Sequence, residues 1–166
     1  MSVVATKKSA DPAIERLNRD AYILLSVLTS QLSADIERLC KEFDITEAHF
    51  RVLWAVCQSS SVDGIAMGEI ADGLINRAAD LTRLVDKLVK LRYVQRMQSP
   101  DDRRKMIVHA TTNGRKVFNK IAALVKHLHV EQWDGLTQSE LRELKRLLNK
   151  ALEPRVTWED RKAWQV

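Results

Sequence analysis

Apolar side chains recur every three or four residues along most of this chain, which is the spacing that places them on one face of an α-helix. The longest such stripe runs from Ile14 to Leu39 and predicts a single helix that begins at Pro12. The 166 residues include only 5 Gly and 3 Pro, so few positions break a helix. The sequence therefore predicts a mainly α-helical protein. Part of the long first stripe is expected to meet another chain, because a small core does not need a helix of that length.

Five further helices and one pair of strands follow along the chain. The helices are expected to begin at Thr46, at Met67, at Asn76 as an N-cap, after Asn113-Gly114, and at Thr137 within the capping-box sequence TQSE, with the last one ending at Pro154. Residues 93–97 and 105–109 have strand character and flank a turn at 99–102, which predicts a β-hairpin. The fourth helix and the hairpin are therefore adjacent in the sequence.

The positive charge of the chain is concentrated in its middle. The whole sequence contains 27 Lys and Arg against 22 Asp and Glu, a formal net charge of +5. Residues 76–105 alone contain nine bases and four acids, so this segment accounts for the entire excess. A localised basic segment in an otherwise neutral protein is the electrostatic pattern of a nucleic-acid-binding element.

The segment NRAADLTRLVDKLVKL combines this charge with a helix that could enter the major groove of DNA. Its apolar positions between Leu81 and Leu91 predict a face buried on its own domain. On the other face, alanine permits close approach to thymine methyl groups, threonine reaches base edges or phosphates, and the basic residues reach guanines or phosphates. The DNA-contacting residues predicted on this helix are Arg77, Ala78, Ala79, Thr82, Arg83 and, further back, Lys87.

Two stretches make the sequence similar to the MarR family of transcriptional regulators. DLTRLVDKLVKLRYVQR, residues 80–96, resembles the family's recognition helix, and SPDDRRKMIVHATTNGR, residues 99–115, resembles its wing and the start of the next helix. Upstream, ITEAHFRVLWAV, residues 45–56, resembles the family's second helix. The resemblance in architecture covers roughly residues 14–153.

This resemblance implies a homodimeric winged helix-turn-helix protein that binds double-stranded DNA at a pseudo-palindromic operator. It also implies a repressor that a small aromatic acid or other phenolic ligand releases from DNA. In the family's wing pattern, Asp102 pairs with Arg104 and stiffens the loop, while Arg103 at the tip enters a minor groove. Lys105 completes the predicted DNA-binding residues of the wing.

Two positions depart from the family's pattern. Arg92 stands where the family commonly has Gly after the recognition helix, and Ala110 stands where Leu is usual before Thr111. The first change adds a base near the DNA, and the second removes apolar surface from the base of the wing. The resemblance therefore determines the geometry of the wing less closely than that of the helices.

The sequence also predicts how the chain is organised into a tail, a domain and a C-terminal extension. Residues 1–11 are expected to form a flexible tail and residues 12–153 a single domain, mainly α with a small β-wing. Within this domain the winged helix covers about 45–112, and helices at about 12–40 and 113–153 form a dimerisation body. Residues 154–166 contain Trp158 and Trp164 and are expected to dock on that body, since an unpacked tail rarely carries two tryptophans.

The resemblance further implies a ligand pocket between the dimerisation helices and the DNA-binding lobe. An aromatic carboxylate needs a cation or hydrogen-bond donor beside an apolar wall, which Arg51 or His49 next to Trp54 could provide. The alternatives are core packing for Trp54 and a solvated or capping role for the other two. The predicted ligand-binding residues are Tyr22, Ser26, Ser30, His49, Arg51 and Trp54.

Other classes of function are less well supported. The sequence has no nucleophile elbow, Gly-rich phosphate loop or metal-ligand spacing, so no enzyme activity, cofactor or metal is expected. Cys40 and Cys57 are expected to be free thiols; a cysteine-based redox-responsive regulator on the same fold is an alternative, as is a winged helix used only for protein–protein contact. With no secretory signal and no apolar run of about 20 residues, a cytoplasmic protein with no membrane partner is expected.

Overall fold

The structure is a computed structural model that describes residues 11–59, 64–73, 80–99, 102 and 105–153. The chain divides into two compact units, Met1–Asp35 and Ile36–Val166. Helix α1, Pro12–Lys41, begins in the first unit and ends in the second. This confirms the single long helix that the first apolar stripe predicts.

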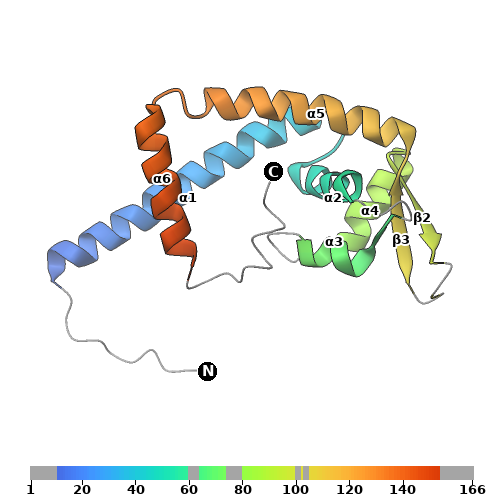
Figure 1. The fold of residues 1–166 in the computed structure, drawn as a ribbon, viewed down its shortest axis with the longest axis horizontal. Helices are drawn as coiled ribbons and strands as arrows, with labels where there is room; N and C mark the ends of the chain where they lie inside the picture. The colour runs from blue at the N-terminus through green and yellow to red at the C-terminus, as the bar shows by residue number, and fades with distance from the viewer. Residues whose placement is uncertain (1–10, 60–63, 74–79, 100–101, 103–104, 154–166) are drawn as a thin grey trace. The chain divides into compact units, whose positions relative to one another are not determined.

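The second unit contains the remaining elements, and the described part of the chain is mainly α-helical with one small antiparallel sheet (Figure 1). The elements are α2 (Glu47–Gln58), β1 (Ile65–Ala66), α3 (Met67–Gly73), α4 (Leu81–Lys90), β2 (Val94–Gln98), β3 (Met106–Ala110), α5 (Thr112–Glu131) and α6 (Gln138–Leu152). Helices α2, α3 and α4 gather with the sheet at one end of α5 (Figure 1). This arrangement is a winged helix-turn-helix.

Two helix starts follow the capping residues that the sequence provides. Thr46 is the N-cap of α2 and Thr137 is the N-cap of α6, and each forms a reciprocal capping box. In α6 the partner is Glu140, as the TQSE sequence predicts, and in α2 the partner is the His49 ring. Each capping box satisfies backbone N–H groups that have no partner inside the helix.

Two other helix starts differ from the prediction. Helix α4 begins at Leu81 rather than after an Asn76 cap, because Asp80 has φ −136° and ψ 32°, which is outside the helical region. Helix α5 begins at Thr112, with Thr111 as its N-cap, so Gly114 lies inside the first turn rather than before the helix. The Thr111 hydroxyl accepts a hydrogen bond from the Gly114 N–H at 2.9 Å and closes this turn.

The predicted hairpin is confirmed, and a third strand extends it. The strand order is β1-β3-β2, with both pairs antiparallel. In the hairpin, Val94 lies opposite Ala110 and Gln98 lies opposite Met106. Strand β1 has two residues, too few for a recognisable period in the sequence, and for that reason the prediction missed it.

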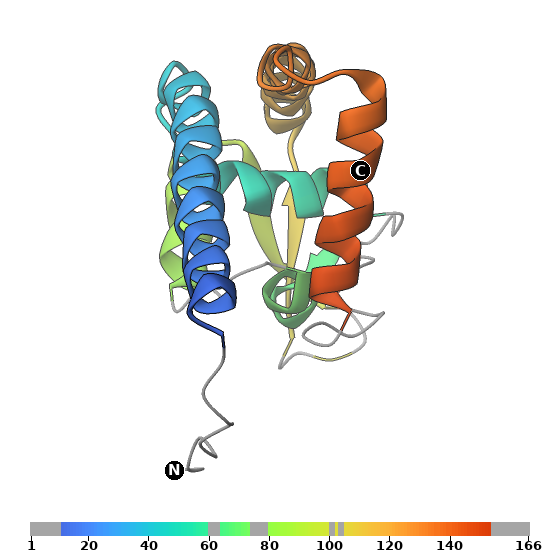
Figure 2. The same ribbon diagram turned by 90° about the vertical axis from the view of Figure 1, so that its left-hand side faces the viewer.

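The hydrophobic core of the second unit joins α2, α4, α5 and the sheet. Helix α2 contacts α3, α4, α5 and β3, and it lies beside α5 in both views (Figure 1, Figure 2). Fully buried side chains come from all of these elements. The part of the second unit formed by α2, α3, α4, the sheet and the adjoining end of α5, called the lobe below, therefore packs around one centre. These buried side chains are Val52, Leu53, Ile70, Val85, Leu88, Val94, Val108 and Ile121.

The apolar side chains of the first unit have a different environment. Between Ile14 and Leu28, α1 carries a series of large apolar side chains that are exposed, with Leu17 at 68% and Leu24 at 70%. Helix α6 also has no buried residue. None of the helices in the described ranges has the length and apolar character that crossing a membrane requires.

Candidate nucleic-acid interface

Helix α4 has one buried face and one exposed face, as the prediction of a recognition helix requires. Leu81, Val85 and Leu88 are buried in the lobe. Thr82 and Arg83, between these core positions, are exposed. The helix is therefore held by its apolar stripe while polar and basic side chains near its N-terminus face solvent.

Two basic side chains of α4 form ion pairs with acids from different parts of the chain. The Arg83 guanidinium lies 3.2 Å from Asp80 in a largely exposed pair. The Lys87 ammonium lies 2.8 Å from the Asp44 carboxylate, in the turn that follows α1. Arg83 can leave its exposed pair at little cost, since such pairs contribute only about 0–1 kcal/mol. Lys87 ties α4 to the rest of the lobe, a contact that the sequence prediction did not include.

The described part of the wing has a closed base. The Ser99 N–H donates to the Lys105 carbonyl at 3.0 Å, and the Lys105 N–H donates to the Asp102 carbonyl at 2.9 Å. Ser99 is buried, whereas the Lys105 side chain is exposed next to the start of β3. Asp102 is half-buried. The base of the turn is thus fixed by backbone hydrogen bonds.

Several predicted residues lie outside the described ranges. Among the predicted DNA contacts these are Arg77, Ala78, Ala79, Arg103 and Arg104. The predicted brace between Asp102 and Arg104 and the docking of residues 154–166 involve the same undescribed stretches. These assignments remain predictions.

Arg96 is a lobe residue whose contacts the sequence prediction missed. It lies on β2, and its guanidinium reaches α4: Nη1 is 2.7 Å from an Asp86 carboxylate oxygen, and Nη2 donates to the Thr82 carbonyl at 3.0 Å. The available signal was its position two residues after Val94, which puts both side chains on one face of the strand. Alternation therefore marks Arg96 as inward-facing but does not identify its partners.

A pocket of about 360 Å³ lies beside this contact. Within the described ranges, its lining residues come from α3, α4 and both wing strands, and they are Met67, Thr82, Arg96 and Met106. Two methionines provide apolar surface, and the Nε atom of Arg96 is buried without a hydrogen-bond partner among the described residues. The pocket therefore combines apolar walls with a guanidinium next to the recognition helix.

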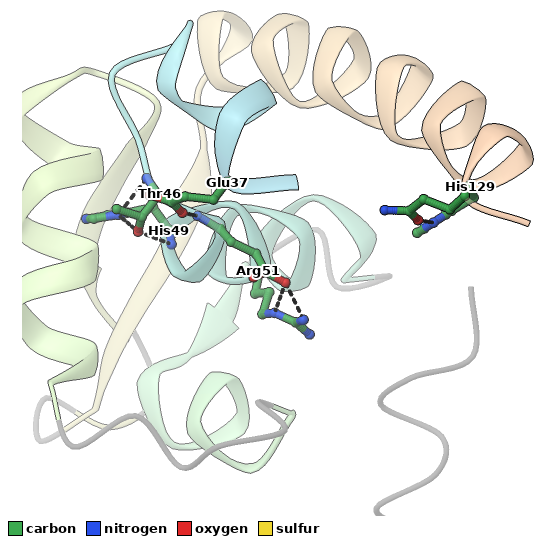
Figure 3. Close-up of polar contacts among 7 residues, drawn as sticks. Glu37, Thr46, His49, Arg51 and His129 are labelled. Carbon is green, nitrogen blue, oxygen red and sulfur yellow. Dashed lines mark hydrogen bonds and ion pairs between the residues drawn. The ribbon is translucent and has the colours of Figure 1, made fainter. Parts of the chain in front are cut away.

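At the start of α2, two of the predicted ligand-binding residues are held by local contacts (Figure 3). The Thr46 N–H donates to Nδ1 of His49 at 3.2 Å, so Nδ1 is unprotonated and the ring serves as a helix cap. Arg51 pairs with Glu47 one turn earlier through both Nε and Nη2. Burial lowers the pKa of His49, and the nearby Lys87 ammonium lowers it further. The capping alternative for His49 is thus confirmed.

The other predicted ligand residues belong to two environments. Trp54 on α2 packs edge-on against Phe50 and Phe118, with ring centroids 5.8 Å and 5.3 Å apart, so it forms part of the lobe's aromatic core. Tyr22, Ser26 and Ser30 lie on α1 within the first unit. A pocket built from both groups would span the two units and remains a prediction.

The two cysteines are free thiols in protected positions. Cys40 is buried and Cys57 is half-buried. Burial raises the pKa of Cys40 to about 12, with Glu37 and Glu47 adding to the effect. Burial raises the pKa of Cys57 to about 11, against the opposing influence of Arg115. Both groups are protonated thiols at neutral pH, and such thiols are weak nucleophiles.

The link from the recognition helix to the wing includes one of the two departures from the family pattern. Arg92 has φ +59°, in the left-handed region that favours glycine. Its carbonyl accepts a hydrogen bond from the Thr111 hydroxyl at 2.7 Å, and the Tyr93 carbonyl accepts one from the Thr111 N–H. An arginine therefore occupies a backbone position that glycine would adopt without strain.

Comparison with known proteins agrees with this geometry. A profile of the transcriptional regulator SarA/Rot family matches residues 34–121. The multiple antibiotic resistance protein MarR of Escherichia coli is 31% identical over 135 residues, which cover 78% of this chain and 92% of that protein. The HTH-type transcriptional repressor IacR of Pseudomonas putida is 24% identical over 140 residues, which cover 83% of this chain and 82% of IacR.

Solved structures show the same likeness. A variant of Escherichia coli MarR complexed with operator DNA matches with a TM-score of 0.69 at 30% identity, over 86% of this chain and 99% of that one. A MarR-like transcription regulator from Bacillus cereus matches with a TM-score of 0.77 at 18% identity, over 85% of this chain and 99% of that one, and supports the fold alone. On its sequence, its winged-helix fold and these relatives, the chain belongs to the MarR family of transcriptional regulators.

Proposed function

We propose that this protein is a homodimeric regulator that binds an operator in double-stranded DNA through α4 and the β2–β3 wing. The observation that carries the proposal is the exposed Thr82 and Arg83 on a helix whose opposite face is buried. The basic excess of residues 76–105 lies in the same segment. The 30% identical MarR structure that contains operator DNA supports this reading.

The proposed DNA contacts divide into two groups by element. On and before α4 they are Arg77, Ala78, Ala79, Thr82, Arg83 and Lys87, and on the wing they are Arg103, Arg104 and Lys105. In the dimer, the two α4 helices would enter successive major grooves and the wings would reach the flanking minor grooves. Lys87, which is paired with Asp44, would act mainly by orienting α4.

The exposed apolar stripe of α1 supports the homodimer. Side chains such as Leu17 and Leu24 are unlike ordinary scattered surface residues because they repeat at helical spacing over several turns. A second copy of the chain would cover the stripe, with α5 and α6 contributing to the same dimerisation body. This division leaves residues 45–112 as the DNA-binding part.

The test uses a duplex selected by the full-length protein from a random double-stranded DNA library. Wild-type affinity is measured by fluorescence anisotropy over a range of salt concentrations. Arg83→Ala and Arg103→Ala are each expected to weaken binding and to reduce the salt slope by about 1, because each removes a phosphate or groove contact. Arg142→Ala, on the exposed face of α6, is the matched control. A wild-type protein without salt-dependent duplex binding would contradict the proposal and favour a winged helix used only for protein contact.

The regulatory direction is proposed to be repression relieved by a small aromatic or phenolic ligand. Relatives of this chain include a protein named as a repressor, IacR, and one named as a transcriptional activatory protein, BadR of Rhodopseudomonas palustris. The pocket beside Thr82 and Arg96 offers the apolar surface of Met67 and Met106 to the ring of such a ligand. A ligand there would touch the recognition helix and the wing together.

A thermal-shift screen of phenolic acids and their coenzyme A thioesters tests this part, followed by release of the selected duplex. Two variants distinguish the two candidate locations. Met67→Ala should weaken the response if the ligand occupies the lobe pocket, and Trp54→Ala should do so if it occupies the pocket predicted between the units. The raised pKa values of Cys40 and Cys57 argue against the redox-responsive alternative. Peroxide-dependent release of DNA that Cys→Ser substitutions abolish would revive it.

A further inference from the structure

Arg96 connects the wing to the recognition helix through a two-point contact. Its side chain is only 26% exposed, although it lies on a strand of the sheet's edge. It follows Val94 on the same face of β2, and Val94 is part of the core. The guanidinium therefore extends from the core outward along the surface of α4.

The contact covers one turn of α4. Thr82 and Asp86 are four residues apart, so their backbone carbonyl and carboxylate lie on the same side of the helix. Nη2 binds the first at 3.0 Å and Nη1 binds the second at 2.7 Å. The planar fork of an arginine can hold two such acceptors in a fixed geometry, which the single ammonium of a lysine cannot do.

These contacts also limit what Arg96 can do elsewhere. Both terminal nitrogens are engaged with α4, and Nε is buried. A phosphate on DNA would have to displace an existing partner to reach the guanidinium. At the same time Arg96 pairs with Asp86, an acid on the helix that is proposed to approach DNA.

We propose that Arg96 is a positioning residue for DNA recognition, and that it fixes α4 relative to the wing through the Thr82 carbonyl and the Asp86 carboxylate. This inference rests on the DNA-binding function proposed above. With the clamp in place, α4 and the wing present their contacts to one duplex in a single geometry. Without it, each element can still bind phosphates, but the two no longer fit the same site together.

Three possible roles of Arg96 would change different measured quantities. A direct phosphate contact contributes to the salt slope on any duplex. A purely structural contact changes the free energy of unfolding but not the ratio of specific to non-specific affinity. A positioning contact lowers that ratio and leaves the salt slope on the scrambled duplex unchanged, because the positioning residue itself neutralises no phosphate.

The experiment measures binding of the selected duplex and of a scrambled duplex of equal length and composition. The proteins are the full-length wild type, Arg96→Met, Arg96→Lys, Asp86→Asn and the double variant Asp86→Asn/Arg96→Met. Arg96→Met should lose about tenfold in affinity for the selected duplex, with scrambled-duplex affinity and salt slope close to wild type. Arg96→Lys keeps the charge but should recover only part of the loss. The double variant should be no weaker than Arg96→Met, because both changes break one clamp.

Other outcomes overturn the inference. A salt slope reduced by about 1 with equal weakening on both duplexes would show a phosphate contact. An unchanged ratio of the two affinities in Arg96→Met would leave only a structural role. Thermal unfolding checks that each variant is folded, and Asp86→Asn tests the clamp from the other side should Arg96→Met fail to fold. Wild-type protein that binds neither duplex would instead contradict the proposed function itself, and the inference would fall with it.

Discussion

The winged-helix lobe and the first half of α1 are built from the same kind of apolar helical stripe, but only the lobe buries its stripe. Leu53, Leu88 and Ile121 are fully buried, whereas Leu17 and Leu24 are more than two-thirds exposed. The lobe is therefore stabilised by contacts inside one chain. The stripe on α1 gains little from folding alone, because apolar surface contributes mainly when it leaves water. The exposed stripe of α1 is therefore the surface that the proposed second copy of the chain would cover.

The largest effect, on dimer association, is expected from a charge placed on the exposed apolar stripe of α1. Leu24→Asp should convert the proposed dimer to monomers, since burying a leucine contributes about 1.5–3 kcal/mol and each dimer contains two copies. We expect a loss of about 3–6 kcal/mol in the free energy of association from this burial. Sedimentation velocity over a range of protein concentrations measures it.

Ser30→Asp is the control for this experiment, because it adds the same charge on a different face of the same helix. It should leave the dimer intact. A wild-type protein that is monomeric at every concentration, or a Leu24→Asp protein that dimerises normally, would break the comparison, since the exposed stripe would then have no partner in a second copy.

The next largest effect is expected inside the closed lobe, at a glycine. A Cβ added at Gly114 would lie 1.8 Å from the Tyr93 carbonyl oxygen, and backbone atoms cannot move aside as a flexible side chain can. Gly114→Ala should lower the free energy of unfolding by about 3 kcal/mol, the upper part of the usual range for overpacking. Urea unfolding with unchanged m-values measures the difference.

The same substitution at Gly135, between α5 and α6, sharpens the comparison. A Cβ there has no atom within 4 Å. Gly135→Ala should change the free energy of unfolding by less than about 1 kcal/mol, in the stabilising direction, because alanine reduces the entropy of the unfolded chain. Equal losses at the two glycines would show that the lobe is not more tightly packed than the helical connection.

The sequence predicts those features that depend on local pattern. Helical period locates α1, and the Thr46 and Thr137 caps locate the starts of α2 and α6, since a cap acts within four residues. Strand β1 is missed because two residues carry no period. The start of α4 is misplaced because the backbone of Asp80 departs from the helix without any Gly or Pro to mark it.

In the candidate site, too, local pattern is predictable and tertiary contacts are not. The outward-facing Thr82 and Arg83 follow from helical period alone. The partners of Arg96 and Lys87 do not, because Asp44 is 43 residues before Lys87 and the Arg96 contact depends on how β2 packs on α4. Sequence reasoning therefore finds which side chains of α4 are exposed, and it misses the side chains that hold the helix in place.

A smaller effect is expected at the connection between α4 and the wing. Arg92 has φ +59°, and a non-glycine residue in the left-handed region costs about 1–2 kcal/mol. Arg92→Gly should therefore raise the free energy of unfolding by about 1 kcal/mol, after allowance for the greater freedom of glycine in the unfolded chain.

Lys90→Gly, two residues earlier at the last position of α4, is the opposite control. It should lower the free energy of unfolding by up to about 1 kcal/mol, because glycine is less favourable than lysine in a helix. Both variants remove one positive charge, so their difference in urea unfolding isolates the backbone. A loss of stability in Arg92→Gly as large as that in Lys90→Gly would show that the left-handed backbone at this position carries no strain.

The smallest effect is a change in how the free energy of unfolding depends on pH, through His49 at the start of α2. His49 caps α2 through an unprotonated Nδ1, so protonation removes the acceptor for the Thr46 N–H and adds a positive charge near the positive end of the helix. Burial and Lys87 lower its pKa, while Glu37 and Asp44 act in the opposite direction. Because the unfolded chain binds the proton more readily, this contribution to stability is present above the unfolded pKa of about 6.5 and is lost as pH falls towards the folded pKa.

His49→Gln tests this contribution, because glutamine at the same position can complete the capping box without titrating. The free energy of unfolding of wild type and variant should be similar at pH 8, and wild type should lose more stability between pH 7 and pH 5. His129→Gln, on α5, is the matched control substitution, because it removes a histidine that contacts Gln132 instead of a cap. Equal slopes for His49→Gln and wild type would mean that Thr46 retains its cap when the ring is protonated. Protonation of His49 would then not lower the stability of the winged-helix lobe, and the contrast between its buried core and the exposed stripe of α1 would remain.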